Sequence, residues 1–293
     1  MFVVTGATGQ FGRLAVDALL RRGVPAAQLA VAVRDTTRAA DLAARGVTVR
    51  GADYDRPETL VPAFTGADKL LFVSANGPDD LRLVQHAAVV DAAARAGVGL
   101  VAYTSIVAAD TNPLSLARVH RDTEARLGAS GLATVLLRNG WYTENYTAGL
   151  AGSVQRGTLV GATGRGAIAS ATRADLAEAA AVVLTSPDDQ AGKTYELTGD
   201  TAWTLDDLAA EASAVSGKDV TYTDLPAAQY AEILAGAGLP AFLVELLVDA
   251  DTRIAEGALA TIAPDLAELL DRPLASLHDT VATSLHDTVA AAR

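Results

Sequence analysis

The sequence contains no cysteine. Disulfides, thiolate metal ligands and a cysteine nucleophile are therefore excluded, although this absence alone does not identify a cellular compartment. Lysine is almost as scarce, because only Lys69, Lys193 and Lys218 occur among 293 residues. Only these three residues could therefore serve as a catalytic lysine.

Positive charge and long apolar runs are also in short supply. The chain has 23 basic and 35 acidic residues, a net charge of −12, which disfavours non-specific binding to nucleic acid or anionic membranes. No apolar run approaches the roughly 20 residues of a membrane span. Phe2 follows Met1 without the basic and apolar regions of a secretory signal. We expect a cytoplasmic protein without nucleic-acid or membrane partners, and the sequence leaves a homo-oligomer open.

The first two thirds of the chain alternate between short apolar runs and longer amphipathic stretches. This alternation is typical of βαβ units around a parallel sheet whose two faces are both covered. The fold class that it predicts is α/β, with a Rossmann-type doubly wound parallel sheet. The expected strands are Phe2–Thr5, Leu29–Arg34, Val47–Arg50, Lys69–Ser74, Leu100–Ser105 and Ala133–Leu137.

After about residue 138 this rhythm loosens into a smaller, mostly helical C-terminal lobe. Capping-box patterns begin helices after Thr172 and Thr204, and a strand is expected at Thr194–Leu197. We therefore assign residues 1–137 and about 160–190 to a Rossmann domain. Residues from about 138–159 and 191–293 are assigned to the lobe, which we expect to bind the substrate.

The C-terminus repeats one octapeptide almost perfectly, at 276–283 and 284–291. Eight residues used twice are too short for a solenoid, so a local duplication that extends a final helix is the better interpretation. His278 and His286 recur in the two copies, but no further residues stand at ligand spacing. We interpret them as a solvated helix face and expect no metal site.

A glycine pattern between the first strand and the first helix indicates nucleotide binding. Gly6 permits the sharp turn, Gly9 lets backbone N–H groups approach a pyrophosphate, and Gly12 lets the helix pack closely on the sheet. The start of the helix then offers unpaired N–H groups and a positive dipole to the phosphates. The expected cofactor contacts in this loop are Gly6, Thr8, Gly9, Gln10, Phe11 and Gly12.

The end of the second strand carries the signal for the type of coenzyme. Arg34 stands where a Rossmann protein recognises the adenosine ribose, and an arginine there suits a 2′-phosphate. Arg38 follows one turn later and would add a second positive contact. Asp35 is a complication, since an inward carboxylate would favour NAD. The pattern favours NADP(H) as the cofactor.

Three further segments follow strands whose carboxyl ends should meet at the same crevice. Asp53 is placed to contact the adenine, and Ser74, Ala75 and Asn76 would pass under the nicotinamide ribose. A third group of hydroxyl-bearing residues ends the fifth strand and should point toward the nicotinamide. Its members are Tyr103, Thr104 and Ser105.

With these residues in place, the chain resembles the NmrA-like group of atypical short-chain dehydrogenases, and within it the bacterial type-2 NAD(P)H:quinone oxidoreductases. The most specific marks are the runs Arg138–Tyr146 and Ile168–Asp175. The resemblance implies NADPH-dependent two-electron reduction of quinones. It also implies cofactor contacts from Arg138, Asn139, Gly140, Trp141, Tyr142 and Thr143. Ala75 and Asn76 depart from the serines typical of the group.

The tyrosine–lysine dyad of most short-chain dehydrogenases is missing, because no tyrosine in the chain has a lysine four residues later. A quinone tolerates this absence, since hydride addition gives an aromatic hydroquinone anion that solvent can protonate. The protein must then supply orientation. We expect a pocket for a flat acceptor built from Asn139, Trp141, Tyr142 and Asn145 with Tyr103, unless the aromatic members simply belong to the core.

His120 and Glu124 lie one turn apart on the helix after the fifth strand, roughly where the dyad would sit. His120 is a possible proton donor, because histidine titrates near neutral pH, although an exposed helix pair is the favoured interpretation. The rival to an enzyme is a sensor that binds NADP(H) without turnover, as some NmrA-like proteins do. The aromatic and amide residues after the sixth strand favour the enzyme.

Overall fold

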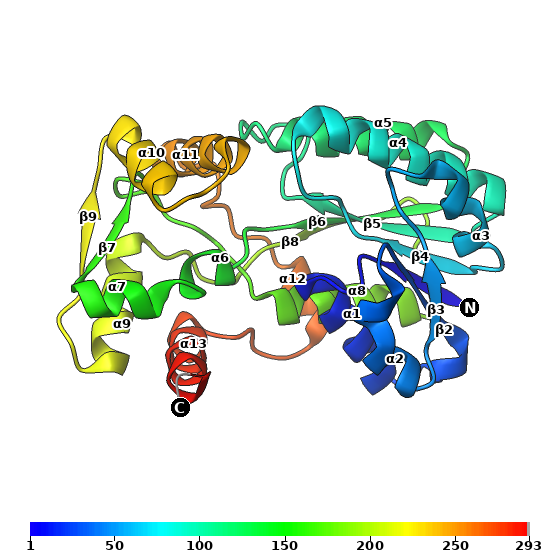
Figure 1. Cartoon of the computed structure of the whole chain (residues 1–293), viewed down its shortest axis with the longest axis horizontal. Helices are drawn as coiled ribbons and strands as arrows, with labels where there is room; N and C mark the ends of the chain where they lie inside the picture. The colour runs from blue at the N-terminus through cyan, green and yellow to red at the C-terminus, as the bar shows by residue number, and fades with distance from the viewer. Residues whose placement is uncertain (292–293) are drawn as a thin grey trace.

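The computed structural model describes residues 1–291 and has a seven-stranded parallel sheet at its centre, in the order β3-β2-β1-β4-β5-β6-β8. This arrangement confirms the Rossmann-type α/β fold, and Figure 1 shows the sheet between two helical layers. The strands of this sheet are β1 (Phe2–Thr5), β2 (Leu29–Val33), β3 (Thr48–Gly51), β4 (Lys69–Phe72), β5 (Leu100–Ile106), β6 (Thr134–Asn139) and β8 (Thr194–Leu197).

Helices cover both faces of the sheet, which explains why strands such as β2 and β5 are buried along their whole length. One face packs against α1 (Gln10–Arg21), α2 (Ala40–Ala44), α8 (Arg173–Thr185) and α12 (Asp265–Leu270). The other packs against α3 (Leu60–Phe64), α4 (Asp79–Ala96) and α5 (Ala117–Ala129). The sheet reverses its order between β1 and β4, which is where doubly wound proteins bind ligands.

The second lobe has its own core around Trp203 and a two-stranded parallel sheet that the sequence analysis missed. Its strands are β7 (Thr158–Gly161) and β9 (Thr221–Asp224). Its helices are α6 (Glu144–Thr147), α7 (Leu150–Arg156), α9 (Leu205–Ser216), α10 (Ala227–Gly236), α11 (Ala241–Ala255) and α13 (Leu277–Ala291). Figure 1 shows this lobe beside the carboxyl ends of the main strands.

The expected boundaries between domain and lobe differ from the structure in two places. β8 was assigned to the lobe, but it pairs with β6 from Leu136↔Thr194 to Asn139↔Leu197 and so forms the edge of the main sheet. α12, also assigned to the lobe, packs its buried Leu266 into the core beside α8. The chain therefore crosses between the two units more often than the sequence suggested.

Local signals for helix ends were correct. Thr172 and Thr204 accept the backbone N–H groups of Asp175 and Asp207, and the second site forms a complete capping box. In α13 the side chain of His278 is 58% exposed and contacts Glu211, as expected of a solvated helix face. Among residues 1–291, no helix has the length and apolar character needed to cross a membrane.

Candidate cofactor crevice

The turn between β1 and α1 has the backbone geometry that the glycine pattern predicts. Gly6 adopts a positive φ of 61°, and the N–H of Gly9 donates to the Gly6 carbonyl at 2.9 Å. A Cβ on Gly12 would lie 2.4 Å from that carbonyl oxygen, so no side chain fits there. The helix starts without a side-chain cap, which leaves its first N–H groups free to bind an anion.

The Asp35 carboxylate does not point inward, as it would in a protein that prefers NAD. It accepts hydrogen bonds from the backbone and the hydroxyl of Thr37, at 3.0 and 2.6 Å, and so caps the short 3₁₀ helix η2 (Thr36–Ala39). These bonds lower the pKa of Asp35. Arg34 and Arg38 are both exposed beside it, and no ion pair with either is found among residues 1–291. The side chains available to a ribose phosphate here are therefore cationic.

The segment after β4 borders the glycine turn. A Cβ on Gly6 would lie 3.5 Å from the Cβ of Val73, which shows how closely the two loops approach. The hydroxyl of Tyr54, beside Asp53, donates to the Val73 carbonyl at 3.1 Å. Ser74 and Ala75 are half-buried, whereas Asn76 is exposed. These residues lie at the β1–β4 reversal, as expected from the strand order.

At the end of β6, one polar atom has no partner within the described chain. The side chain of Asn139 is buried, its Nδ2 lies 3.5 Å from the hydroxyl of Tyr142, and its Oδ1 accepts no hydrogen bond. Buried amide oxygens are normally satisfied. The ring of Tyr142 is stacked on Phe11 of the glycine turn, with centroids 6.3 Å apart. Asn139 and Tyr142 thus lie on the glycine-turn side of the crevice.

Other members of the expected acceptor pocket are placed differently. The Trp141 ring is 8% exposed and packs in the core of the second lobe, opposite to the direction of Tyr142. Asn145 is exposed, and its Oδ1 accepts from Arg173 at 2.8 Å. A cavity of about 230 Å³ adjoins Trp141 at the ends of β5, β6 and β8. It is lined by Val107, Ala108, Gly140, Trp141, Ala169, Glu196, Thr198, Ala258, Leu259, Thr261 and Ala263.

The structure corrects the interpretation of Tyr103 and His120. Tyr103 is fully buried under α4 and α5, so it does not line a pocket; its hydroxyl lies 2.8 Å from Nδ1 of His120. His120 was expected to form an exposed pair with Glu124, but it is 4% exposed. Burial and the nearby Arg82 guanidinium hold the pKa of His120 well below its ordinary value. The ring is therefore neutral at physiological pH.

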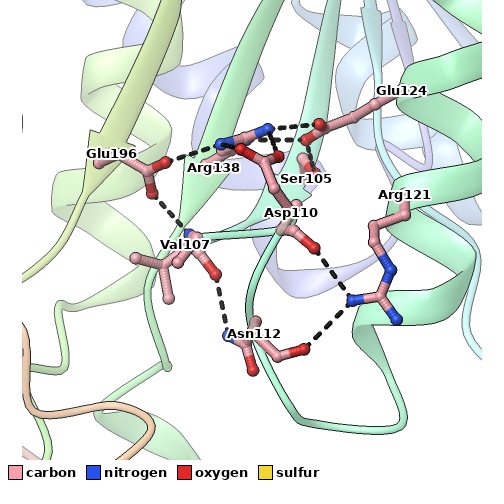
Figure 2. A network of polar contacts seen from close by, with 10 residues as sticks. Ser105, Val107, Asp110, Asn112, Arg121, Glu124, Arg138 and Glu196 are labelled. Atoms are coloured by element: carbon pink, nitrogen blue, oxygen red, sulfur yellow. Dashed lines mark hydrogen bonds and ion pairs between the residues drawn. The ribbon is translucent and has the colours of Figure 1, made fainter.

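Glu124 instead belongs to a network around Arg138 (Figure 2), a residue that the resemblance placed on the cofactor. All five N–H groups of Arg138 donate to the carboxylates of Asp110, Glu124 and Glu196. These bonds raise the pKa of the guanidinium. Its side chain has no N–H left for a coenzyme, so its role here is to join β6 to α5 and β8.

Hydroxyls expected to point at the nicotinamide are also engaged within the protein. Ser105 donates to Glu124 in the network of Figure 2. Thr104 accepts the backbone N–H of Ser74 at 2.9 Å. The hydroxyl of Thr143, a cofactor contact implied by the resemblance, is buried and bonds that of Ser170 at 2.8 Å. These three side chains stabilise the loops around the crevice.

Residues 6–187 match the NAD(P)H-binding family. The chain belongs to this family. Quinone oxidoreductase 2 of Escherichia coli (strain K12) is 46% identical over 273 residues, which cover 93% of this chain and 94% of that relative. The resemblance to bacterial quinone oxidoreductases is thereby confirmed.

Two solved structures of family members are similar over nearly the whole chain. An NADPH-dependent quinone oxidoreductase from Escherichia coli, complexed with NADPH, aligns with a TM-score of 0.92 and 45% identity, covering 97% of this chain and 99% of that one. Triphenylmethane reductase from Citrobacter sp., complexed with NADP(H), has a TM-score of 0.93 and 39% identity, covering 97% and 100%.

The residues of this NAD(P)H-binding chain fit a dinucleotide coenzyme. The uncapped start of α1 suits a pyrophosphate, the exposed Arg34 suits an anionic ribose, and the unpartnered Oδ1 of Asn139 can accept an N–H or O–H group. The sequence analysis missed Arg82 and His86 of α4, which are buried behind the loop after β4. The sequence did offer one signal for them, because Arg82 and His86 lie four residues apart, and so on one face of a helix, directly after the loop that follows β4.

A carboxylate in the second lobe gives a prediction about stability. Asp251 is 4% exposed, and its Oδ2 accepts the N–H of Ala162 at 2.8 Å. Burial raises its pKa to about 6. Because this folded-state value exceeds that of the unfolded chain, the associated stability is present at low pH and is lost as pH rises through 6.

We therefore expect Asp251→Asn, which keeps an acceptor for Ala162 but carries no charge, to stabilise the protein at pH 8. The gain should be up to about 3 kcal/mol, since the pKa is raised from 3.8 to about 6 and each pKa unit corresponds to about 1.4 kcal/mol. Urea unfolding at pH 8 and pH 4.5 measures it, and the difference between the two proteins should be smaller at the lower pH. A variant that is less stable than the parent at pH 8 would contradict this account.

Proposed function

We propose that this chain is an NADPH-dependent oxidoreductase that reduces quinones to hydroquinones in a single two-electron step, without a tyrosine–lysine dyad. The observation that carries the proposal is the buried, unpartnered Oδ1 of Asn139, a residue whose Nδ2 lies beside Tyr142, which is stacked on Phe11. It lies one residue from the backbone of Gly140, which lines the apolar cavity. Similarity to quinone oxidoreductase 2 over 93% of the chain supports the same activity.

The bound coenzyme supplies the hydride, and the chain's own residues bind and orient the reactants. The N–H groups at the start of α1 would hold the pyrophosphate, and Arg34 would bind the 2′-phosphate. The free Oδ1 of Asn139 would accept a hydrogen bond from the nicotinamide end and so orient it. Neutral, buried His120 is not placed to donate a proton to an acceptor, because both its nitrogens are engaged by Tyr103 and Arg82. The hydroquinone anion therefore takes its proton from solvent.

The cavity beside Trp141 is our proposed acceptor pocket. It lies at the carboxyl ends of β5, β6 and β8, and most of its lining is aliphatic or aromatic. Its volume of about 230 Å³ is smaller than the pockets that hold drug-sized ligands. A small acceptor, such as a one-ring benzoquinone, suits this space better than a three-ring quinone.

The direct test is a steady-state assay with purified protein, NADPH and a set of quinones. We expect NADPH oxidation that depends on added benzoquinone and is faster than with NADH. Quinones of one, two and three rings should give progressively lower kcat/KM if the cavity holds the acceptor. Tight NADPH binding without turnover of any quinone would overturn the enzyme and favour a sensor of NADP(H).

Filling the cavity should affect the acceptor alone. Thr261 lines the cavity and its side chain is exposed, so Thr261→Trp can occupy the space without disturbing the core. We expect the KM for benzoquinone to rise at least tenfold, which corresponds to about 1.4 kcal/mol, while the Kd for NADPH stays unchanged. Ile262→Trp is the matched control, since Ile262 is 50% exposed and does not line the cavity. Equal KM values in the two variants would refute this location.

A further inference from the structure

Two buried side chains of α4 hold a single residue of the loop after β4. The N–H of Ala75 donates to Nε2 of His86 at 2.9 Å, and Nε of Arg82 donates to the Ala75 carbonyl at 2.8 Å. His86 is fully buried and Arg82 is 3% exposed. Both polar groups of one loop residue are thus engaged by side chains from the helix that the loop enters.

The hydrogen bonds behind His86 fix the direction of this contact. Nδ1 of His86 lies 2.8 Å from the hydroxyl of Thr123, which itself donates to the Val119 carbonyl at 2.7 Å. The hydroxyl proton is used in that bond, so the Thr123 oxygen accepts a hydrogen bond from the protonated Nδ1 of His86. The neutral ring of His86 therefore keeps its Nε2 lone pair to accept the N–H of Ala75. Thr123 of α5 thus fixes the tautomer of His86 on α4.

Arg82 is an unusual group to bury. Its nearest carboxylate among residues 1–291 is Asp79, at 3.5 Å, and its remaining partner is Nε2 of His120, at 3.3 Å. Removing a guanidinium from water without close pairing is costly, and apolar replacements of buried charges are often neutral or stabilising. The observed contacts therefore favour a role in specifying the geometry of the loop over a role in stability.

The loop that these residues hold is restrained at three successive N–H groups. Val73 donates to the hydroxyl of Thr5 at 2.9 Å, Ser74 donates to Thr104 at 2.9 Å, and Ala75 donates to His86. The first two acceptors come from strands β1 and β5 on either side. Because Val73 also lies against Gly6, the position of this loop determines how closely it approaches the glycine turn at the β1–β4 reversal.

We propose that Arg82 and His86 are positioning residues, which hold the segment Ser74–Asn76 in its coenzyme-binding position before the coenzyme arrives. Binding then does not have to order this loop, and affinity increases accordingly. Neither residue needs to touch the coenzyme. The inference rests on the proposed binding of NADPH in the crevice, and one of its tests is independent of that binding.

The first test uses the protein without coenzyme. Hydrogen–deuterium exchange should be slow at the N–H groups of residues 73–75 in the parent. We expect it to be at least tenfold faster in His86→Leu and in Arg82→Met. Arg95→Met, an exposed site at the far end of α4, should exchange there like the parent. Unchanged protection in folded His86→Leu and Arg82→Met would overturn the proposal, whatever the protein binds.

The second test separates the two ends of the coenzyme. NADPH and adenosine 2′,5′-bisphosphate, which lacks the nicotinamide half, are titrated by fluorescence and calorimetry. We expect His86→Leu and Arg82→Met to raise the Kd of NADPH about tenfold, or about 1.4 kcal/mol, with little change for the bisphosphate. His86→Gln, which keeps an acceptor for Ala75, should recover most of the loss.

Equal weakening of both ligands would indicate general damage and count against positioning. If His86→Leu does not fold, Thr123→Val removes only the hydroxyl that orients His86. That variant should bind NADPH about threefold more weakly, and parental affinity would overturn the proposal. Failure of the parent itself to bind NADPH would refute the proposed function, while the exchange experiment would still decide the role of the two side chains.

Discussion

Replacing Arg34 with alanine should reduce kcat/KM for NADPH by about 100-fold, mainly through KM. The residue is exposed at the end of β2, and its neighbour Asp35 is occupied in capping η2. A charge-assisted hydrogen bond contributes about 1.5–3 kcal/mol, and the upper part of this range corresponds to the expected factor. NADH has no 2′-phosphate, so its kcat/KM should change less than threefold.

The comparison of the two coenzymes is the informative measurement, because a general loss of activity would affect both. Arg38→Ala should give a smaller loss with NADPH, since Arg38 lies one turn further along the chain. Arg95→Ala, at an exposed site on α4, controls for the loss of one positive charge. Parallel losses with NADPH and NADH in Arg34→Ala would show that Arg34 does not recognise the phosphate.

Acidification should destabilise the protein steeply below pH 6.5. Burial lowers the pKa of His86 to about 3 and lowers that of His120 well below its ordinary value. The unfolded chain takes up these protons near pH 6.5, so the stability is present above this pH and is lost as pH falls toward the folded-state values. His86 alone should remove roughly 2 kcal/mol between pH 7 and pH 5. His120 adds to this loss in the same direction.

Urea unfolding at pH 5, 6, 7 and 8 measures this loss. Asp251 acts in the opposite direction over part of the range, so the measurement is clearest in Asp251→Asn. His278→Gln is the control, because His278 is exposed and its pKa is raised by Glu211. Histidine NMR should show that the rings of His86 and His120 do not titrate between pH 5 and 8. A flat stability profile, or titration of these two rings near pH 6.5, would contradict the buried neutral state.

Features set by neighbouring residues could be predicted from the sequence. The glycine turn, the N-caps at Thr172 and Thr204 and the strands of the main sheet all depend on local backbone preferences. β7 and β9 could not be predicted in the same way. Each is stabilised by the other across about sixty positions of the chain, and β9 is mostly exposed, so it lacks the buried apolar run that marks strands such as β1 and β4.

The predictions of site residues from the sequence failed mainly where they depended on the direction of a side chain at the end of a strand. Tyr103 and Thr104 were both expected at the nicotinamide, yet alternation along β5 places Tyr103 under α4 and α5. After β6 the side chains of Trp141 and Tyr142 likewise point in different directions, because Tyr142 packs against the core of the main sheet and Trp141 packs in the core of the second lobe. The network around Arg138 draws carboxylates from the loop after β5, α5 and β8, so no local pattern could reveal it.

The position of β8 has a consequence for the order in which the protein assembles. The edge of the main sheet is completed by residues 194–197, and α12 is added after residue 264, following a passage through the other lobe. The ribosome must therefore synthesise residues 1–197, about two thirds of the polypeptide, before β6 acquires its second neighbour. Fragments ending near residue 190 would leave that strand open to pairing with other chains. Such fragments should consequently aggregate when they are expressed alone.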